Sequence, residues 1–159
     1  ANAVHGFDLD QERLGIVRSH PSLHDDATLI CGAISTTSGQ TIGYAPRSTG
    51  HLSTTQAGET VESGQKVVTL SLDDYCSTVN ISPDIVKIDI EGGEIDALRG
   101  FEPTLSEDPP KHFLIEVHPD LLRERGEDPK NVEMILEEQG YKCEQIPGDG
   151  MRVHATYIS

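Results

Sequence analysis

The stretch from Pro83 to Gly100 constrains the fold most, because a strand pattern changes into a helix pattern across two glycines. Residues 85–90 are mostly isoleucine and valine, which pack well on a pleated strand. Gly92-Gly93 predicts a tight turn, and apolar residues at helical spacing follow from Ile95 to Phe101. A strand, turn and helix in this order is typical of α/β sheets, where ligands bind just beyond the carboxyl ends of the strands.

Acidic side chains and an imidazole stand at the ends of two predicted strands. Asp89 and Glu91 lie two residues apart at the end of the first strand, so they share one face. A second apolar run, Phe113–His118, ends with Glu116 and His118 in the same arrangement. If the strands are parallel neighbours about 4.8 Å apart, we expect the four side chains to lie around one cavity at one edge of the sheet.

Three carboxylates and an imidazole suit either a divalent cation or a general base that acids hold in place. His118 is the candidate catalytic base, because an imidazole has an ordinary pKa of about 6.5. Asp89, Glu91 and Glu116 are candidate catalytic groups that orient the imidazole. They are also the candidate ligands of a divalent cation that makes a hydroxyl more acidic. A buried ion pair between Lys87 and Asp89, with the strand ends in solvent, is the alternative that these residues leave open.

A longer signature contains these residues: Asp84-Ile85-Val86-Lys87-Ile88-Asp89-Ile90-Glu91-Gly92-Gly93-Glu94, then Leu98-Arg99-Gly100, then Ile115-Glu116-Val117-His118. It resembles the core of the FkbM-type methyltransferases, and the resemblance extends from about Val4 to the C-terminal strands. The resemblance implies an α/β fold with a Rossmann-like class I methyltransferase sheet, helices on both faces and a C-terminal antiparallel hairpin. It also implies methyl transfer from S-adenosylmethionine, mostly to hydroxyls of sugars and natural products.

The resemblance also implies where S-adenosylmethionine binds. Asp8 follows the first predicted strand, where an acidic side chain hydrogen-bonds a ribose diol in dinucleotide-binding sheets. Capping of the next helix by Asp8 or Asp10 is the alternative. The resemblance places the adenine near the backbone of Gly32 and Ala33. With Asp89 added, these are the expected cofactor-binding residues.

The remaining elements alternate between strand and helix patterns. The strand at residues 27–35 is expected to turn back as a hairpin with residues 40–45. Pro46–Gln65 is rich in Ser, Thr and Gly and is expected to be a mobile loop, either a substrate lid or a plain connection. Further expectations are a Ser71 helix cap, a connection at residues 103–111, a helix at 129–139, and a hairpin of residues 141–146 with 152–158.

The glycine-rich unit that normally opens this class of methyltransferase does not occur in these residues. In the resembled family it reads like Asp-x-Gly-Ala-Asn-x-Gly, whereas this chain starts at what corresponds to the second strand. We therefore expect residues 1–159 to form a single methyltransferase-like domain that lacks its first βα unit. Cofactor binding by this chain alone depends on that unit.

The net charge of -15 argues against nucleic acid and anionic membranes as partners, because both attract basic proteins. Such acidity suits a high-salt cytoplasm or an ordinary acidic soluble protein, and both stay open. Cys31, Cys76 and Cys143 have no spacing typical of zinc sites or disulfide frameworks. They predict reduced thiols and a cytoplasmic location. No apolar run reaches the length of a membrane span.

The expected function is therefore S-adenosylmethionine-dependent O-methylation of a sugar or another small-molecule hydroxyl. The alternative is a non-catalytic α/β binding or assembly module that has lost the cofactor site. A metal-dependent hydrolase using the same carboxylates is less favoured, because the sequence offers no further histidine ligands near them. A homo-oligomer is compatible with the sequence.

Overall fold

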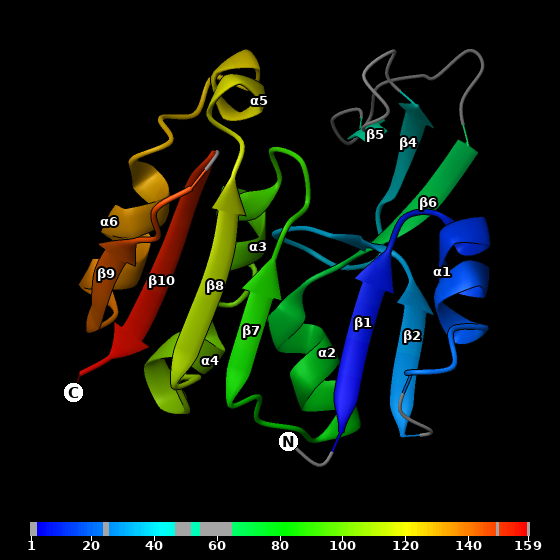
Figure 1. Cartoon of the computed structure of the whole chain (residues 1–159), viewed down its shortest axis with the longest axis horizontal. Helices are drawn as coiled ribbons and strands as arrows, with labels where there is room; N and C mark the ends of the chain where they lie inside the picture. Colours follow the sequence, from blue (N-terminus) through cyan, green and yellow to red (C-terminus); the bar gives the residue numbers. More distant parts are fainter. Residues whose placement is uncertain (1–2, 24–25, 47–51, 55–64, 149, 159) are drawn as a thin grey trace. The chain divides into compact units, whose positions relative to one another are not determined.

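The computed structural model describes residues 3–23, 26–46, 52–54, 65–148 and 150–158. The chain divides into two compact units, Ala1–Leu70 and Ser71–Ser159. The first unit contains β1 (Val4–Asp8), α1 (Gln11–Arg18), β2 (Ala27–Cys31), β3 (Ala33–Ile34), β4 (Thr41–Pro46), β5 (Leu52–Thr54) and β6 (Gln65–Leu70), as Figure 1 shows. The second contains α2 (Leu72–Val79), β7 (Ile85–Ile88), α3 (Glu94–Arg99), α4 (Glu102–Glu107), β8 (His112–Val117), α5 (Pro119–Glu124), α6 (Asn131–Glu138), β9 (Tyr141–Gln145) and β10 (Met151–Tyr157).

In the first unit, β1 and β2 form a parallel pair in which Phe7 lies opposite Ile30. The helix between them begins at a side-chain cap. Oδ1 of Asp10 accepts hydrogen bonds from the amides of Glu12 and Arg13, at 2.8 and 3.4 Å. Amides in the first turn of a helix have no partner within the helix, so this cap stabilises the start of α1.

The second sheet of this unit has the strand order β3-β6-β4-β5, so the hairpin predicted from residues 27–45 is wrong. β6 lies between β3 and β4, parallel to β3 and antiparallel to β4. The intervening turn is held on β6, because the Gly39 amide donates to the Thr69 carbonyl at 2.9 Å. A turn motif in the sequence indicates that the chain reverses direction. It does not indicate that a third strand pairs between the two strands that the turn joins.

The structure describes only a part of the predicted loop at Pro46–Gln65. Leu52–Thr54 forms β5, which pairs antiparallel with β4, so this part of the stretch is a strand. Residues 47–51 and 55–64 lie outside the described residues, and the prediction of a mobile loop is untested there.

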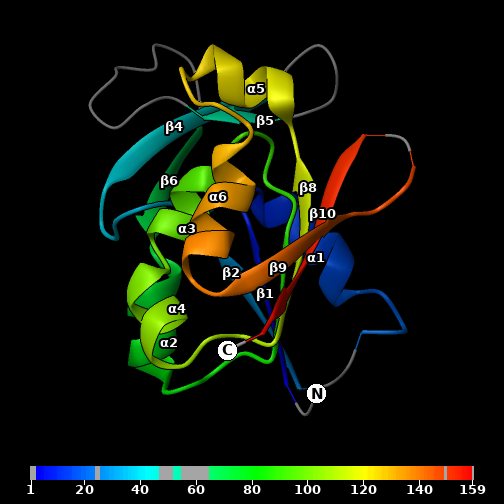
Figure 2. The same ribbon diagram turned by 90° about the vertical axis from the view of Figure 1, so that its left-hand side faces the viewer.

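The sheet of the second unit has the order β7-β8-β10-β9. β7 and β8 are parallel, with Ile88 opposite Ile115, and β10 is antiparallel to both of its neighbours. The predictions of parallel neighbours and of a C-terminal antiparallel hairpin are therefore confirmed. The helices α3, α4 and α6 lie on one side of this sheet (Figure 2). Phe113 is fully buried, with its ring edge-on to those of Phe101 and Tyr141.

Local signals predict the bounds of most helices and strands, and three of these predictions differ from the structure. Oγ of Ser71 accepts from the Asp74 amide at 3.2 Å, which confirms the predicted cap of α2. Pro103 lies in the first turn of α4, where its missing N–H costs nothing, so the connection predicted there is wrong. α6 starts at Asn131 rather than Pro129, and β7 ends at Ile88 rather than Ile90. None of the described helices is both long and apolar enough to cross a membrane.

Candidate functional site

The turn after β7 has a backbone that few residues can adopt. Glu91 and Gly92 both have positive φ, at 54° and 91°. A Cβ atom on Gly92 would lie 2.8 Å from Cβ of Leu121, closer than side chains pack, so this position requires glycine. The turn replaces the expected strand extension, and strand alternation therefore does not decide where the side chains of Asp89 and Glu91 point.

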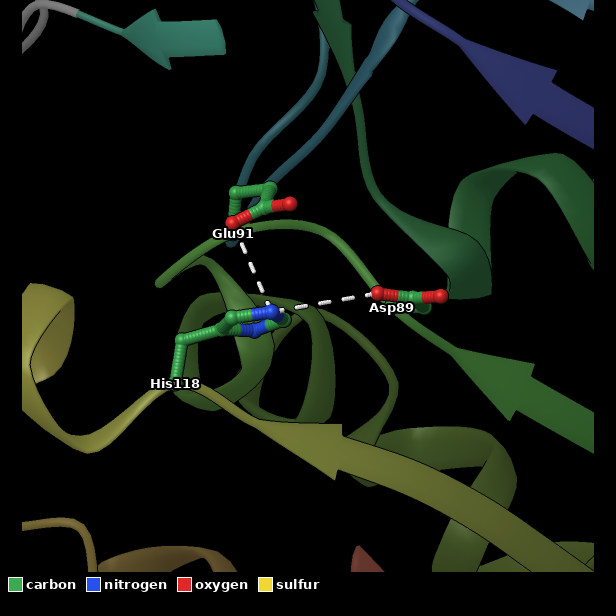
Figure 3. Close-up of side chains that lie close together, drawn as sticks. All are labelled: Asp89, Glu91 and His118. Carbon is green, nitrogen blue, oxygen red and sulfur yellow. Dashed lines mark ion pairs between the residues drawn. The ribbon is translucent and has the colours of Figure 1, made fainter. Parts of the chain in front are cut away.

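Three of the four predicted strand-end residues nevertheless meet. His118 directly follows β8, and its Nε2 lies 3.4 Å from Oε2 of Glu91 and 4.0 Å from Oδ1 of Asp89 (Figure 3). One ligand atom from each residue lies within 4.8 Å of the other two. We call Asp89, Glu91 and His118 the strand-end cluster. It has the donor types of a cation site and, equally, the acids that hold a base.

Glu94 is a site residue that the sequence analysis did not identify. Its Oε1 lies 2.7 Å from Nδ1 of His118 and accepts from the Gly92 amide at 3.0 Å. The side chain is 0% exposed, although it carries a carboxylate. The available signal was a charged residue at helical spacing with Leu98 and Phe101, both of them buried. A carboxylate on the buried side of a helix needs a polar partner.

The surrounding carboxylates raise the pKa of His118. The hydrogen bond with Glu94 is the largest cause that raises the pKa of His118, and the charges of Glu94, Glu91 and Asp89 add to it. Partial burial acts in the opposite direction and lowers this pKa. With a proton on Nδ1, this N–H donates to Oε1 of Glu94, and Nε2 faces the carboxylates of Glu91 and Asp89. The imidazole therefore has one fixed nitrogen and one available for proton or metal binding.

Glu116 does not join the strand-end cluster. Its two carboxylate oxygens each lie 3.3 Å from a guanidinium nitrogen of Arg152, which stands opposite it on β10. Directly opposed side chains of antiparallel strands interact closely, so the pairing of β10 with β8 draws this carboxylate to Arg152. The ion pair of the alternative is present, with Nζ of Lys87 2.9 Å from Oδ2 of Asp89, but it is not buried, and Glu91 and His118 are partly buried instead of in solvent. This pair is exposed and adds little stability.

Sequence comparison decides the family. The profile of the methyltransferase FkbM domain matches residues 7–143. The chain belongs to the FkbM methyltransferase family. The fold agrees: the crystal structure of methyltransferase FkbM from Methylobacillus flagellatus is similar with a TM-score of 0.61 at 15% sequence identity. The match covers 98% of this FkbM-family chain but only 36% of that chain. Curated proteins gave no match in a sequence search.

The residues expected to bind cofactor in this FkbM-family chain lie partly in the first unit. Asp8 ends β1, and its Oδ1 accepts from the Asp10 amide at 2.7 Å, which orients the carboxylate. The Gly32 amide donates to the Asp8 carbonyl at 3.0 Å, and Ala33 is buried next to it. An oriented carboxylate at a strand end suits the two hydroxyls of a ribose, so these residues fit the adenosine part of S-adenosylmethionine. Asp89 belongs to the second unit and to the strand-end cluster.

Proposed function

We propose that this chain contributes to an S-adenosylmethionine-dependent methyltransferase that O-methylates a sugar or another small-molecule hydroxyl. Membership of the FkbM family supports methyl transfer. The observation that carries the choice of a hydroxyl is the imidazole of His118, held by a buried carboxylate at the carboxyl ends of two parallel strands. A hydroxyl must lose a proton when it is methylated, and this arrangement can receive one.

The residues have separate proposed roles. Asp8 would bind the ribose hydroxyls, with the backbone of Gly32 and Ala33 against the adenine. Asp89 remains a further proposed cofactor-binding residue. S-adenosylmethionine, when bound, supplies the methyl group.

His118 is the proposed general base of the cation-free site. Nε2 of His118 would take the hydroxyl proton while the methyl group is transferred, the bond of that group to the sulfonium sulfur breaking as its bond to the acceptor oxygen forms. Glu94 would stabilise the resulting imidazolium through its bond with Nδ1, and Glu91 would do so by its charge. Glu116 could act only if it were released from Arg152.

A methyl-transfer assay tests this function. Isotope-labelled S-adenosylmethionine is incubated with the protein and a panel of sugars and other small hydroxyl compounds, and the products are analysed by mass spectrometry and NMR. We expect a methyl ether as the product. His118→Ala should lower turnover by roughly 10²–10⁴-fold, the usual contribution of a general base, with nearly unchanged affinity for S-adenosylmethionine. Methylation of nitrogen or sulfur instead of oxygen would contradict the proposal.

The setting of the protein is also part of the proposal. The net charge of -15 favours small molecules over nucleic acids or anionic membranes as partners. Cys31, Cys76 and Cys143 are all free thiols, which supports the cytoplasm as its location. A non-catalytic binding module is the weaker alternative, because it gives no reason to bury Glu94 beside His118.

A further inference from the structure

We propose that Asp89, Glu91 and His118 bind a divalent cation, and that Glu94 orients the histidine ligand from behind. This ligand set differs from the one predicted from the sequence, in which Glu116 was a ligand and His118 was not. The binding site itself stands on the geometry of the second unit alone. Only its catalytic consequence rests on the proposed methyltransferase function.

The spacing of the donor atoms suits a shared cation. Nε2 of His118 lies 3.4 Å from Oε2 of Glu91 and 4.0 Å from Oδ1 of Asp89. Atoms that each bind one cation at about 2.1 Å lie roughly 3–4 Å from one another. Glu91 and His118 are partly buried and Asp89 is exposed, and all three come from the ends of two hydrogen-bonded strands. Small side-chain movements would therefore complete the coordination.

The charges around the cluster leave a negative excess. The carboxylates of Asp89, Glu91 and Glu94 surround one imidazole, and the exposed ammonium of Lys87 balances one of them. Among these five groups, the three carboxylates outnumber the positive charges by one even with His118 protonated. Negative charge in a partly buried place is costly unless a cation compensates it. A divalent cation would replace the proton on Nε2 and remove this excess.

Glu94 provides an observation that is independent of the acidic cluster. Its side chain is 0% exposed and reaches into the cluster, where Oε1 contacts Nδ1 of His118 at 2.7 Å. Within the described part of the chain, its other oxygen, Oε2, has no hydrogen-bond partner. Histidines that bind metals usually donate their second N–H to a carboxylate or carbonyl, which fixes the ring and the tautomer. Glu94 and His118 have this arrangement, with Nε2 left for the cation.

The donor set indicates the class of cation. Two carboxylate oxygens and one imidazole nitrogen suit first-row divalent ions such as Mn²⁺, Fe²⁺ or Zn²⁺. Three protein ligands also leave coordination positions for a substrate oxygen. A cation there would lower the pKa of a bound hydroxyl. Since the cation uses the lone pair of Nε2, His118 would be a ligand and not the base in the loaded site. A chelator that removes the cation would free Nε2 to act as the base again.

Titration with Mn²⁺ tests the site without any assay of activity. Free Mn²⁺ is followed by electron paramagnetic resonance in about 0.5 M KCl, which screens weak binding to the acidic surface. We expect one saturable Mn²⁺ per chain. Asp89→Asn, Glu91→Gln and His118→Ala should each weaken binding at least about tenfold, and Glu94→Gln by roughly 10–100-fold, the usual effect of a lost orienting group.

Asp120→Asn is the matched control. Asp120 lies two residues from His118 and its side chain is 95% exposed, so the variant removes the same charge without removing a ligand. Its Mn²⁺ affinity should equal that of the unmodified protein, and so should that of Glu116→Gln. Circular dichroism verifies that each variant is folded. If Glu94→Gln fails to fold, Asp89→Asn still tests the site, since Asp89 lies in a partly exposed turn.

Several results would overturn the inference. These are the absence of saturable Mn²⁺ binding, equal affinity in Asp89→Asn and the unmodified protein, or equal weakening in Asp120→Asn and Asp89→Asn. The last would mean general attraction to the acidic surface. Weakened binding in Glu116→Gln would restore the ligand set predicted from the sequence. The two proposals fail separately: methyl transfer to oxygen without Mn²⁺ binding contradicts only the cation site, and Mn²⁺ binding with methyl transfer to nitrogen or sulfur contradicts only the proposed O-methylation.

Discussion

Oε1 of Glu94 lies 2.7 Å from Nδ1 of His118 and also accepts the Gly92 amide at 3.0 Å. One buried oxygen thus ties the turn after β7 to the residue that follows β8. The position of the imidazole is set by α3, the helix that carries Glu94, and not only by its own strand. The predictions below begin from this contact.

Replacement of Glu94 should separate its hydrogen bonding from its charge. Glu94→Leu leaves the Gly92 amide and Nδ1 of His118 without their acceptor, and unsatisfied buried groups cost about 1–3 kcal/mol each. Glu94→Gln keeps an acceptor oxygen and should cost less. Urea unfolding at neutral pH measures both free energies of unfolding. A leucine variant as stable as the glutamine variant would show that these hydrogen bonds contribute no net stability.

Gly92→Ala should destabilise the turn more than Gly126→Ala. Both glycines have positive φ, 91° and 79°, which is unfavourable for alanine and costs of order 1 kcal/mol or more. Only at Gly92 would the new Cβ also collide, at 2.8 Å from Leu121, whereas Gly126 has open space. Thermal or urea unfolding of the two variants gives the comparison. Equal losses of stability would mean that the turn moves easily away from Leu121.

Asp8 should matter for cofactor affinity, while Asp10 should matter for stability. Asp8→Ala removes a proposed contact with ribose, and a hydrogen bond with a charged group contributes about 1.5–3 kcal/mol, or roughly 10–100-fold in affinity. Asp10→Ala removes the cap of α1 and should cost about 1 kcal/mol of stability with unchanged affinity. Calorimetry with S-adenosylmethionine and urea unfolding measure the two effects. Unchanged affinity in Asp8→Ala would exclude Asp8 from the site.

The ion pair between Arg99 and Glu127 should stabilise the fold only above acidic pH. Its closest atoms are 2.6 Å apart, and the hydrogen bond with Arg99 is the main cause that lowers the pKa of Glu127. Because the folded pKa lies below the unfolded value of about 4.3, the contribution is present above that value and is lost as pH falls through the folded pKa.

The effect of this ion pair should be small, because the Arg99 side chain is 39% exposed and solvent screens the pair. We expect Glu127→Gln to cost about 1 kcal/mol or less at pH 7. The difference from the unmodified protein should shrink towards pH 3. Urea unfolding at several pH values measures it, with Glu144→Gln as the comparison, since the pair of Glu144 with Lys142 is more exposed. A difference that stays constant with pH would assign the effect to packing.

The three thiols should react with iodoacetamide in order of exposure. Cys31 is exposed, whereas Cys76 is buried. Burial raises the pKa of Cys143 to about 11, so at pH 8 roughly one thiol in a thousand is the reactive thiolate. Mass spectrometry of timed samples should find Cys31 modified first, and the other two only at the rate of unfolding. Early modification of Cys143 would mean that β9 opens readily.

The sequence by itself determined most of the local elements. Ser71 and Asp10 start helices because their side-chain oxygens satisfy free amides within three residues, which needs no distant partner. The strands at Ile85 and His112 and the C-terminal hairpin also follow from local apolar patterns and a turn. The turn at Gly92 was readable from its two glycines, and the signature around Asp89 pointed to the FkbM family, which the match to residues 7–143 confirms.

Only the tertiary structure decided which strands pair and which charges meet. The position of β6 between β3 and β4, the contact of Glu116 with Arg152, and the contact of Glu94 with His118 all join residues at least 21 positions apart. Side-chain periodicity assigns a residue to a face, but not to the strand or helix that comes to lie beside it. A carboxylate takes the nearest partner that offsets its loss of solvation, and that partner depends on strand order. For this reason Glu116 pairs with an arginine of β10, and Glu94 contacts the histidine of the strand-end cluster instead.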